Sequence, residues 1–178
     1  MKFIKDLLFF EITSTGNDVD KDSILQLSAV VLDKDNLLEK GFFNSYIRVS
    51  YLDNVIWEHS KLLRILPETL KKSHKVYDVI KQFHKHFGKH HLLATHTLTN
   101  LLFLKQGFKK ALVPFDYDVH VLDLWTLGYI YTLNFGLKKM PTANTFFDNF
   151  NLKLSNPYDA LEKVRLEAEV FRKIIKQV

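Results

Sequence analysis

The first fifty residues show the hydrophobic pattern of three consecutive strands. Residues 7–12 are apolar except at Glu11, which is typical of a strand that is buried on both faces. Residues 24–32 are rich in branched apolar side chains, and residues 41–49 combine aromatic with aliphatic ones. Polar turn residues separate the three runs. We therefore predict an antiparallel three-stranded meander at the start of the chain.

From residue 75 the apolar residues recur every three or four positions, which indicates a helix that buries one face. This helix spans 75–87 and ends at Gly88. Short strands and helices then follow, with strands at 91–95 and 119–122 and helices at 97–108, 124–133, 142–150 and 158–176. The order of elements predicts an α/β fold, a five-stranded mixed sheet of meander plus parallel strands with helices on both faces. No repeat or linker interrupts the pattern, so we predict a single domain over residues 1–178.

The amino-acid composition limits which cellular location and which binding partners are expected. Hydrophobic residues make up 47% of the chain and charged residues 25%, which is the balance of a globular protein and not of a disordered one. Because there is no cysteine, disulfides and thiolate metal sites are excluded. The start lacks a secretory signal pattern and no stretch is long enough to span a bilayer, so we expect a cytoplasmic location and no membrane partner. The formal net charge of +5 suits either a polyanion partner or simple solubility.

Three segments of the chain combine an apolar run with a few polar residues, and together they point to a known family. The first reads F-E-I-T-S-T-G from Phe10 to Gly16 and is followed by I-L-Q-L-S-A-V at 24–30 and F-N-S-Y-I-R at 43–48. The second reads A-T-H-T-L-T-N-L-L-F-L from Ala94, and the third reads Y-D-A-L-E-K-V from Tyr158. In order and spacing they resemble the motifs of the DEDDh-type 3′–5′ exonucleases, a family that includes proofreading subunits and ribonuclease T. The resemblance covers almost the whole chain and implies a ribonuclease H-like fold.

The resemblance also locates the family's catalytic positions, and all five hold a different residue here. In the first motif, the family's aspartate falls on Glu11 and its glutamate on Thr13. In the second motif, the family's aspartate falls on Asn100. The general-base histidine falls on Tyr158 and the last aspartate on Lys163. Members with the full set hydrolyse phosphodiesters of DNA or RNA with Mg²⁺ or Mn²⁺.

The residues at these positions suit that chemistry poorly. Two cations about 4 Å apart need several carboxylates around them, and only Glu11 supplies one. A cation at Lys163 repels metal ions, and we expect its ammonium to pair with Glu11 instead. Tyr158, with an ordinary pKa of about 10, is a poor proton acceptor at neutral pH. We therefore predict no catalytic metal and a pseudo-exonuclease that binds nucleic acid or a partner protein.

Two alternatives stay open. Asp123 and Asp159 lie near the motifs and together with Glu11 could hold one Mg²⁺ or Mn²⁺, which would make the chain an active, divergent 3′–5′ exonuclease with relocated ligands. The plainer interpretation of Asp159 is a first-turn carboxylate that favours the start of a helix. The other alternative is a self-assembly or protein-interaction module, a homo-oligomer or a partner of another protein, with no role in nucleic-acid binding.

Phosphate-binding candidates for single-stranded DNA or RNA lie in and near the motifs. They are Thr15, Gly16, Lys138, Lys139, Lys163 and Arg165. A second group of interest is the histidines His84, His86, His90 and His91, which straddle Gly88. Because that glycine interrupts the helix that a zinc-binding pair would need, we interpret them as solvated residues near a helix end. His96 in the second motif is interpreted as a core or cleft residue.

Overall fold

The computed structural model describes residues 2–49, 64–118, 120–134 and 145–177. Lys138 and Lys139 lie outside these ranges. The strands are β1 (Leu7–Ser14), β2 (Ile24–Leu32), β3 (Glu39–Arg48), β4 (His74–Lys75), β5 (Leu92–Thr95) and β6 (Val121–Asp123). The helices are α2 (Pro67–Lys72), α3 (Val76–Phe87), α4 (Leu98–Lys110), α5 (Leu124–Leu133), the 3₁₀ helix η1 (Asp148–Phe150) and α6 (Ala160–Ile175).

The strands form one mixed sheet in the order β4-β3-β2-β1-β5-β6. β1, β2 and β3 pair as the predicted antiparallel meander, and β5 and β6 extend it as parallel strands beside β1. The prediction of five strands was wrong by one. The sixth strand is β4, which pairs with the end of β3 through only two residues and is too short to leave a periodic pattern.

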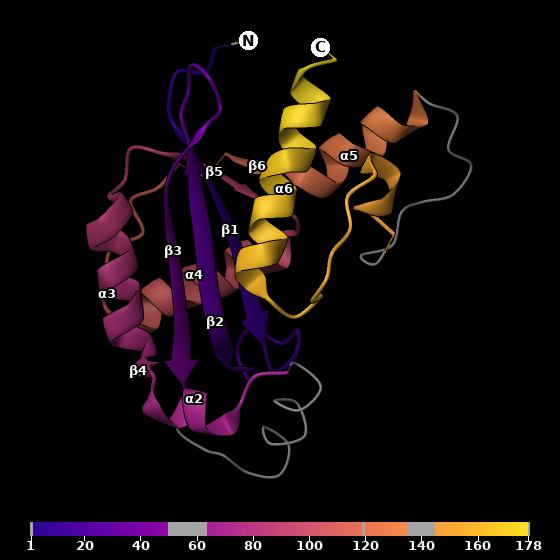
Figure 1. The fold of residues 1–178 in the computed structure, drawn as a ribbon. Coiled ribbons are helices and arrows are strands. Elements are labelled where there is room, and N and C mark those ends of the chain that lie inside the picture. The colour runs from indigo at the N-terminus through magenta and orange to yellow at the C-terminus, as the bar shows by residue number, and fades with distance from the viewer. Residues whose placement is uncertain (1, 50–63, 119, 135–144, 178) are drawn as a thin grey trace.

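Helices cover both faces of the sheet, as predicted (Figure 1). α3 and α4 pack on one face through a core that includes Phe10, Phe83 and Phe108. α5 and α6 pack on the other face, where Phe9 meets Phe171. Since the central strands bury side chains on both sides, β2 is buried at all nine positions, which explains its continuous apolar sequence.

Several predicted boundaries are corrected by local interactions. α6 begins at Ala160 and not at residue 158, because the Asp159 carboxylate caps the helix from outside. The helix predicted at 142–150 is, in its described part, a turn at 145–147 followed by η1, which ends at Asn151 in the left-handed region. The burial of Phe146, Phe147 and Phe150 produced the helix-like spacing there. α2 was not predicted.

Gly128 allows α5 to approach the aromatic cluster closely. A Cβ at this position would lie 2.5 Å from the Phe146 ring, which is fully buried. The glycine costs about 1 kcal/mol in helix propensity relative to alanine, so close packing explains its presence within a helix.

We predict that Gly128→Ala destabilises the protein by about 1–3 kcal/mol in spite of the better helix propensity of alanine, because the added methyl group forces Phe146 out of its position. Urea denaturation followed by circular dichroism measures the change. Thr126→Ala, on an exposed position of the same helix, is the control and should change stability little. A stabilised Gly128→Ala variant would contradict the packing explanation.

Candidate functional site

Glu11 lies in the middle of β1 and is buried, with 3% of its surface exposed. Its neighbours Phe10 and Ile12 point into the core beneath α3 and α4. Because side chains alternate along a strand, Glu11 and Thr13 point to the opposite face, toward α6. The family's first two catalytic positions are therefore placed together, on the side of the sheet from which the third motif approaches.

Lys163 of α6 meets Glu11 at this point. Its ammonium donates to Oε1 of Glu11 in a direct ion pair, as the sequence predicts. The second carboxylate oxygen of Glu11 accepts a hydrogen bond from the Asn100 side-chain amide. That amide also donates to the Thr95 hydroxyl at 3.1 Å. Both oxygens of the only family-position carboxylate are thus engaged by protein donors.

The surroundings of Lys163 favour its charged form. Burial alone would lower the pKa of Lys163, but the charge of Glu11 and the hydrogen bond to it outweigh burial, and the net direction is upward. The lysine is therefore cationic throughout the physiological pH range. Removing Lys163 would leave the buried charge of Glu11 without an oppositely charged partner.

Glu167 is a buried carboxyl that lies outside the family's motif positions. It lies one helical turn beyond Lys163 on α6, is fully buried, and neither carboxyl oxygen has a hydrogen-bond partner among the described residues. Burial, followed by the nearby charge of Glu11, raises its pKa well above the ordinary value. Both effects disfavour the charged form of Glu167.

A sequence signal for Glu167 did exist. Val164, Ala168 and Phe171 form the buried stripe of α6, and a period of 3.6 residues places position 167 on that same stripe. A carboxylate on the apolar face of an amphipathic helix is unusual, and this position could have been selected on that ground alone.

His96 is a further buried polar residue near the ion pair. It is 2% exposed, and its ring lies 4.5 Å from the Phe146 ring, centroid to centroid. Burial lowers the pKa of His96 to about 4, with Lys163 acting in the same direction and Glu11 against it. The imidazole is therefore neutral at pH 7, and the core interpretation from the sequence agrees with its placement.

The two remaining family positions contact each other through the backbone. The Thr13 hydroxyl donates to the Tyr158 carbonyl oxygen at 3.4 Å. Tyr158 itself lies in the turn that leads into α6 and is only partly buried. The structure thus brings Glu11, Thr13, Asn100 and Lys163 to one place, with the backbone of Tyr158 beside them.

The proposed substitute ligands serve as helix caps. Asp123 accepts the Thr126 backbone N–H at 2.6 Å at the start of α5. Asp159 accepts the Leu161 N–H at 2.9 Å at the start of α6. Each carboxylate is held by its own helix N-terminus, and in the described part of the chain no group of three or more His, Asp or Glu side chains is arranged to hold a metal ion.

The donor set does not fit the two divalent cations of the family. Glu11 has a lysine on one oxygen and an amide on the other, and Thr13 and Asn100 are neutral. Burial and the charge of Glu11 disfavour the charged form of Glu167, which makes it a poor metal ligand. A cation entering here would have to displace the ammonium of Lys163 against like-charge repulsion.

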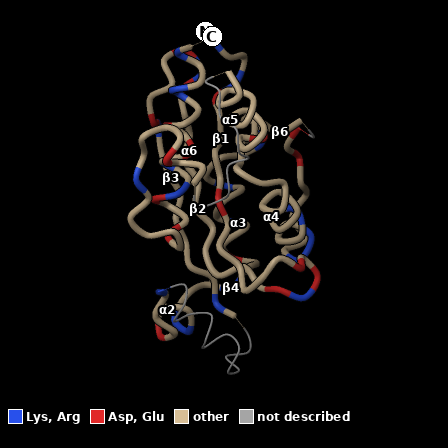
Figure 2. Tube along the Cα trace, turned by 90° about the vertical axis from the view of Figure 1, so that its right-hand side faces the viewer, with Lys and Arg blue, Asp and Glu red and all other residues tan. Residues whose placement is uncertain are grey.

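The nucleic-acid candidates are dispersed. Thr15 and Gly16 lie in the β1–β2 loop, where the Thr15 hydroxyl donates to the Asp22 carboxylate at 3.0 Å. A Cβ on Gly16 would lie 2.4 Å from an Asp22 oxygen, which explains the glycine. Arg165 pairs with Glu39 at 2.9 Å and lies over the Phe42 ring. Lys and Arg positions are interspersed with Asp and Glu positions along the chain (Figure 2).

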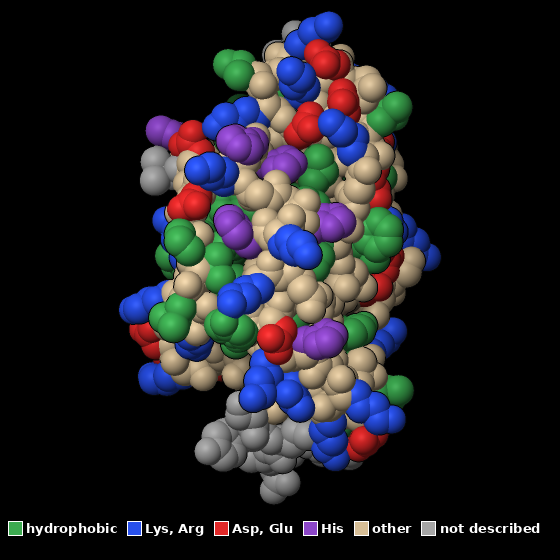
Figure 3. Space-filling view, turned by 90° about the vertical axis from the view of Figure 1, so that its left-hand side faces the viewer, with side chains coloured by type: hydrophobic (Ala, Val, Ile, Leu, Met, Phe, Trp, Pro, Cys, Tyr) green, Lys and Arg blue, Asp and Glu red, His purple; other side chains and the backbone are tan. Residues whose placement is uncertain are grey.

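The histidines near Gly88 pack on aromatic rings and do not converge. His84 lies edge-on to Phe108, with ring centroids 5.8 Å apart, and His86 lies 4.6 Å from the Phe87 ring. Histidine side chains are scattered over the face that α3 presents (Figure 3). Their arrangement indicates packing at the edge of the α3 core.

Comparison with known proteins assigns the family. An exonuclease family model, RNase_T, matches residues 10–144. No curated protein sequence matches the chain. Among solved structures, cell-death related nuclease 4 superposes with a TM-score of 0.82 at 14% identity over 97% of this chain and 64% of that one. The nuclease domain of 3′hExo, a DEDDh family member, superposes with a TM-score of 0.80 at 13% identity, over 99% of this chain and 95% of that one. Exonuclease I of E. coli superposes with a TM-score of 0.75 at 14% identity, over 97% of this chain and 41% of that one.

The fold is therefore that of the ribonuclease H-like exonucleases, and the chain belongs to the RNase_T exonuclease family, as its DEDDh-type motifs predict. It spans 64% of the length of cell-death related nuclease 4 and less than half of exonuclease I. No helix among the described residues is long and apolar enough to cross a membrane.

We predict that Lys163→Met destabilises the protein by about 3 kcal/mol, because it leaves the buried Glu11 charge without its partner. The double variant Glu11→Leu with Lys163→Met should recover most of that loss. Urea denaturation of the single and double variants measures both changes. Arg165→Met, which removes an exposed pair on the same helix, is the matched control and should cost less than about 1 kcal/mol. Equal costs for the Lys163 and Arg165 variants would contradict the account of the site.

A second prediction concerns pH. Glu167 has a raised pKa when folded, so the folded state keeps a proton that the unfolded chain releases above about pH 4.5. Its stabilising effect is thus present at low pH and is lost as the pH rises through the folded pKa. Glu167→Gln cannot ionise and should gain stability relative to wild type more at pH 8 than at pH 5. Denaturation curves at both values test this, and an equal difference at both would contradict the assignment.

His96 should contribute a pH dependence of opposite direction. Its pKa is about 4 when folded and 6.5 in an ordinary environment, so stability is lost as the pH falls from about 6.5 toward 4. His96→Phe, which keeps an aromatic ring against Phe146, should flatten that acid limb of the stability profile. An unchanged acid limb in this variant would assign the pH dependence to other groups.

Proposed function

We propose that this chain is a non-catalytic exonuclease-fold domain that binds single-stranded nucleic acid without cutting it. The observation that carries the proposal is the ion pair between Lys163 and Glu11 at the position of the family's metal ligands. A cytoplasmic location is part of the proposal and is supported by the absence of cysteine.

The energetics support loss of catalysis. At an effective dielectric constant of about 20, a divalent cation about 4 Å from an ammonium group is repelled by about 8 kcal/mol. That repulsion cancels the attraction of a single carboxylate at the same distance, so Glu11 alone gives a metal ion no net advantage. The general base is also lacking, because Tyr158 replaces the histidine and contacts Thr13 only through its carbonyl oxygen.

Related structures support nucleic acid as the ligand. The nuclease domain of 3′hExo is described as bound to rAMP, and exonuclease I of E. coli as in complex with a dA16 oligonucleotide. The β1–β2 loop places Thr15 and Gly16 directly after β1, and the net charge of +5 favours a polyanion. Lys163 is engaged by Glu11 and Arg165 by Glu39, so phosphate contacts are expected from other basic side chains.

A protein partner is the second candidate, and α5 favours it. This helix carries no charged residue, and Ile130 and Leu133 on it are 55% and 49% exposed. Exposed apolar side chains on an uncharged helix are typical of a protein-binding surface. This candidate predicts binding that salt does not weaken, whereas binding to nucleic acid should weaken steeply as salt rises.

The proposal is tested by giving the site back a carboxylate. We predict that wild type shows no thermal shift with millimolar Mn²⁺. The variant Lys163→Asp removes the cation and adds a third carboxyl group beside Glu11 and Glu167, so the metal should stabilise it. Lys153→Asp, an exposed position with the same charge change, controls for non-specific binding. A Mn²⁺-dependent shift of wild type as large as that of Lys163→Asp would contradict the proposal.

Nucleic-acid binding needs its own measurement. Fluorescence anisotropy with labelled single-stranded DNA and RNA of about fifteen nucleotides should show binding that falls steeply between low and physiological salt. Absence of binding to both at low salt would overturn this half of the proposal and favour the protein-binding candidate.

A further inference from the structure

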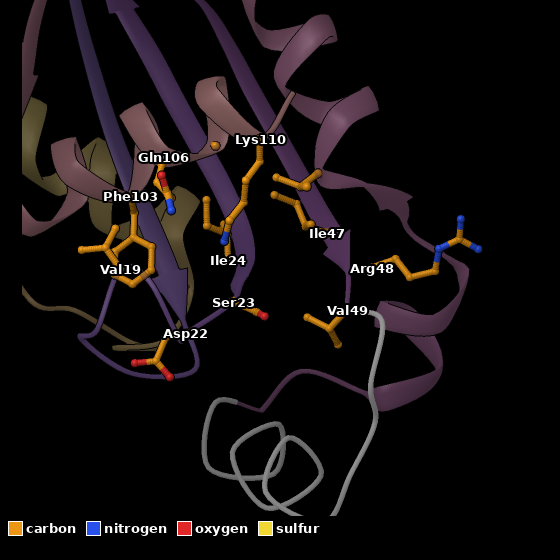
Figure 4. Close-up of a pocket in the computed structure, with 12 residues that line it drawn as sticks. Val19, Asp22, Ser23, Ile24, Ile47, Arg48, Val49, Phe103, Gln106 and Lys110 are labelled. Carbon is orange, nitrogen blue, oxygen red and sulfur yellow. The ribbon is translucent and has the colours of Figure 1, made fainter. Parts of the chain in front are cut away.

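A pocket of about 200 Å³ lies between α4, the β1–β2 loop and the ends of β2 and β3 (Figure 4). Its lining includes Ile24 at the start of β2, Ile47 near the end of β3, and Phe103 on α4. These three side chains belong to the core beneath α3 and α4. The pocket is therefore a recess in the apolar core that opens at the edge of the sheet.

The pocket and the Glu11–Lys163 pair lie on opposite faces of the sheet. Ile24 and Phe103 point into the core of α3 and α4, whereas Glu11 points toward α6 and pairs with Lys163 there. The sheet itself separates the two places. A ligand in this pocket would thus be bound without contact with the family's catalytic positions.

Three polar side chains above the apolar floor have hydrogen-bonding or ion-pairing groups that remain available to a ligand. The Lys110 side chain runs down into the pocket (Figure 4) and forms no ion pair with any described residue. The Ser23 hydroxyl, directed into the same space, makes no hydrogen bond within the described ranges. Gln106 donates its amide N–H to Asp20 at 3.3 Å, which leaves its carbonyl oxygen as an acceptor.

The other charged side chains at the pocket are engaged or turned away. Both oxygens of Asp22 accept hydrogen bonds inside the β1–β2 loop, from the Thr15 hydroxyl and the Asp18 backbone N–H. The Arg48 guanidinium points away from the cavity (Figure 4). Lys110, an exposed residue at the C-terminal end of α4, is therefore the lining cation directed toward the mouth of the pocket.

We propose that this pocket binds a single nucleotide unit, with the base on the apolar floor and the phosphate on Lys110. An apolar cavity of about 150 Å³ holds a benzene ring, so 200 Å³ accommodates one base and leaves the phosphate at the mouth. A plain hydrocarbon ring would leave the Ser23 hydroxyl and the Gln106 carbonyl without partners, and these groups match the donor and acceptor edge of a base. The proposal does not rest on the function proposed for the Glu11 face.

The base and phosphate in the pocket could belong to a free mononucleotide or to one nucleotide of a strand. The following titrations distinguish the two ligands. Adenosine monophosphate, adenosine, inorganic phosphate and a hexameric deoxyadenylate are titrated into the ¹⁵N-labelled full chain. The pocket predicts shifts of the Gly107 backbone amide and the Gln106 side-chain amide, with the Asn100 side-chain amide unchanged. The monophosphate should bind better than adenosine or phosphate alone, and binding of the hexamer at the same amides with higher affinity would identify a strand as the source.

Variants decide whether the assigned side chains carry the binding. Lys110→Glu should weaken the monophosphate roughly tenfold or more, as expected for loss of a charge-assisted contact, and Ser23→Leu should fill the pocket and abolish binding. Lys109→Glu makes the same charge change at the adjacent residue, which is also exposed but does not line the pocket. It is the matched control and should change affinity less than about threefold.

Three outcomes would overturn the proposal. They are no binding at millimolar monophosphate, shifts centred on Asn100 in place of Gly107, and equal losses in the Lys110 and Lys109 variants. Shifts centred on Asn100 would place the nucleotide on the Glu11 face and leave the proposed nucleic-acid function standing, so the two proposals fail separately.

Discussion

A single buried ion pair determines the character of the site. Glu11 is almost completely shielded from water between β1 and α6, and a carboxylate there is tolerated only with Lys163 and Asn100 on its two oxygens. The same burial acts on two neighbouring groups: it raises the pKa of Glu167 and lowers that of His96 to about 4, so the uncharged form of each is favoured. The cluster therefore has about as much positive as negative charge, whereas a two-metal centre requires a clear excess of negative charge.

The fold does not depend on that chemistry. Apolar packing on both faces of the sheet, from Phe10 and Phe83 on one side to Phe9 and Phe171 on the other, holds the strands and helices in place. This explains how the chain superposes on exonucleases with TM-scores of 0.75 to 0.82 at only 13–14% identity. A packed core of suitable volume and pattern can hold the same fold with different residues, and site chemistry is not fixed by the fold.

Much of this architecture could be predicted from the sequence, because long apolar runs indicate buried strands and apolar residues at helical spacing indicate the buried face of a helix. The meander, α3, α5 and the pairing of Lys163 with Glu11 were predicted and confirmed. The two-residue strand β4 and the turn at 145–147 were not, since so few residues carry no period. Glu167 was missed because it is not a family position, although its place on the apolar stripe of α6 was visible. Asp159 was interpreted from the sequence as a carboxylate at the start of a helix, and the structure places it there as the cap of α6. The capping role of Asp123 was not predicted, because it depends on where α5 begins and boundaries are the least determined feature of a sequence pattern.

The claim that this member of the family no longer cuts nucleic acid is tested most directly by product analysis at single-nucleotide resolution. Purified wild-type protein is incubated with 5′-labelled single-stranded DNA and RNA in the presence of Mg²⁺ or Mn²⁺. The pairing of Lys163 with Glu11 predicts that both substrates keep their full length. Stepwise loss of 3′ nucleotides that requires the metal and disappears in Glu11→Gln would contradict the account.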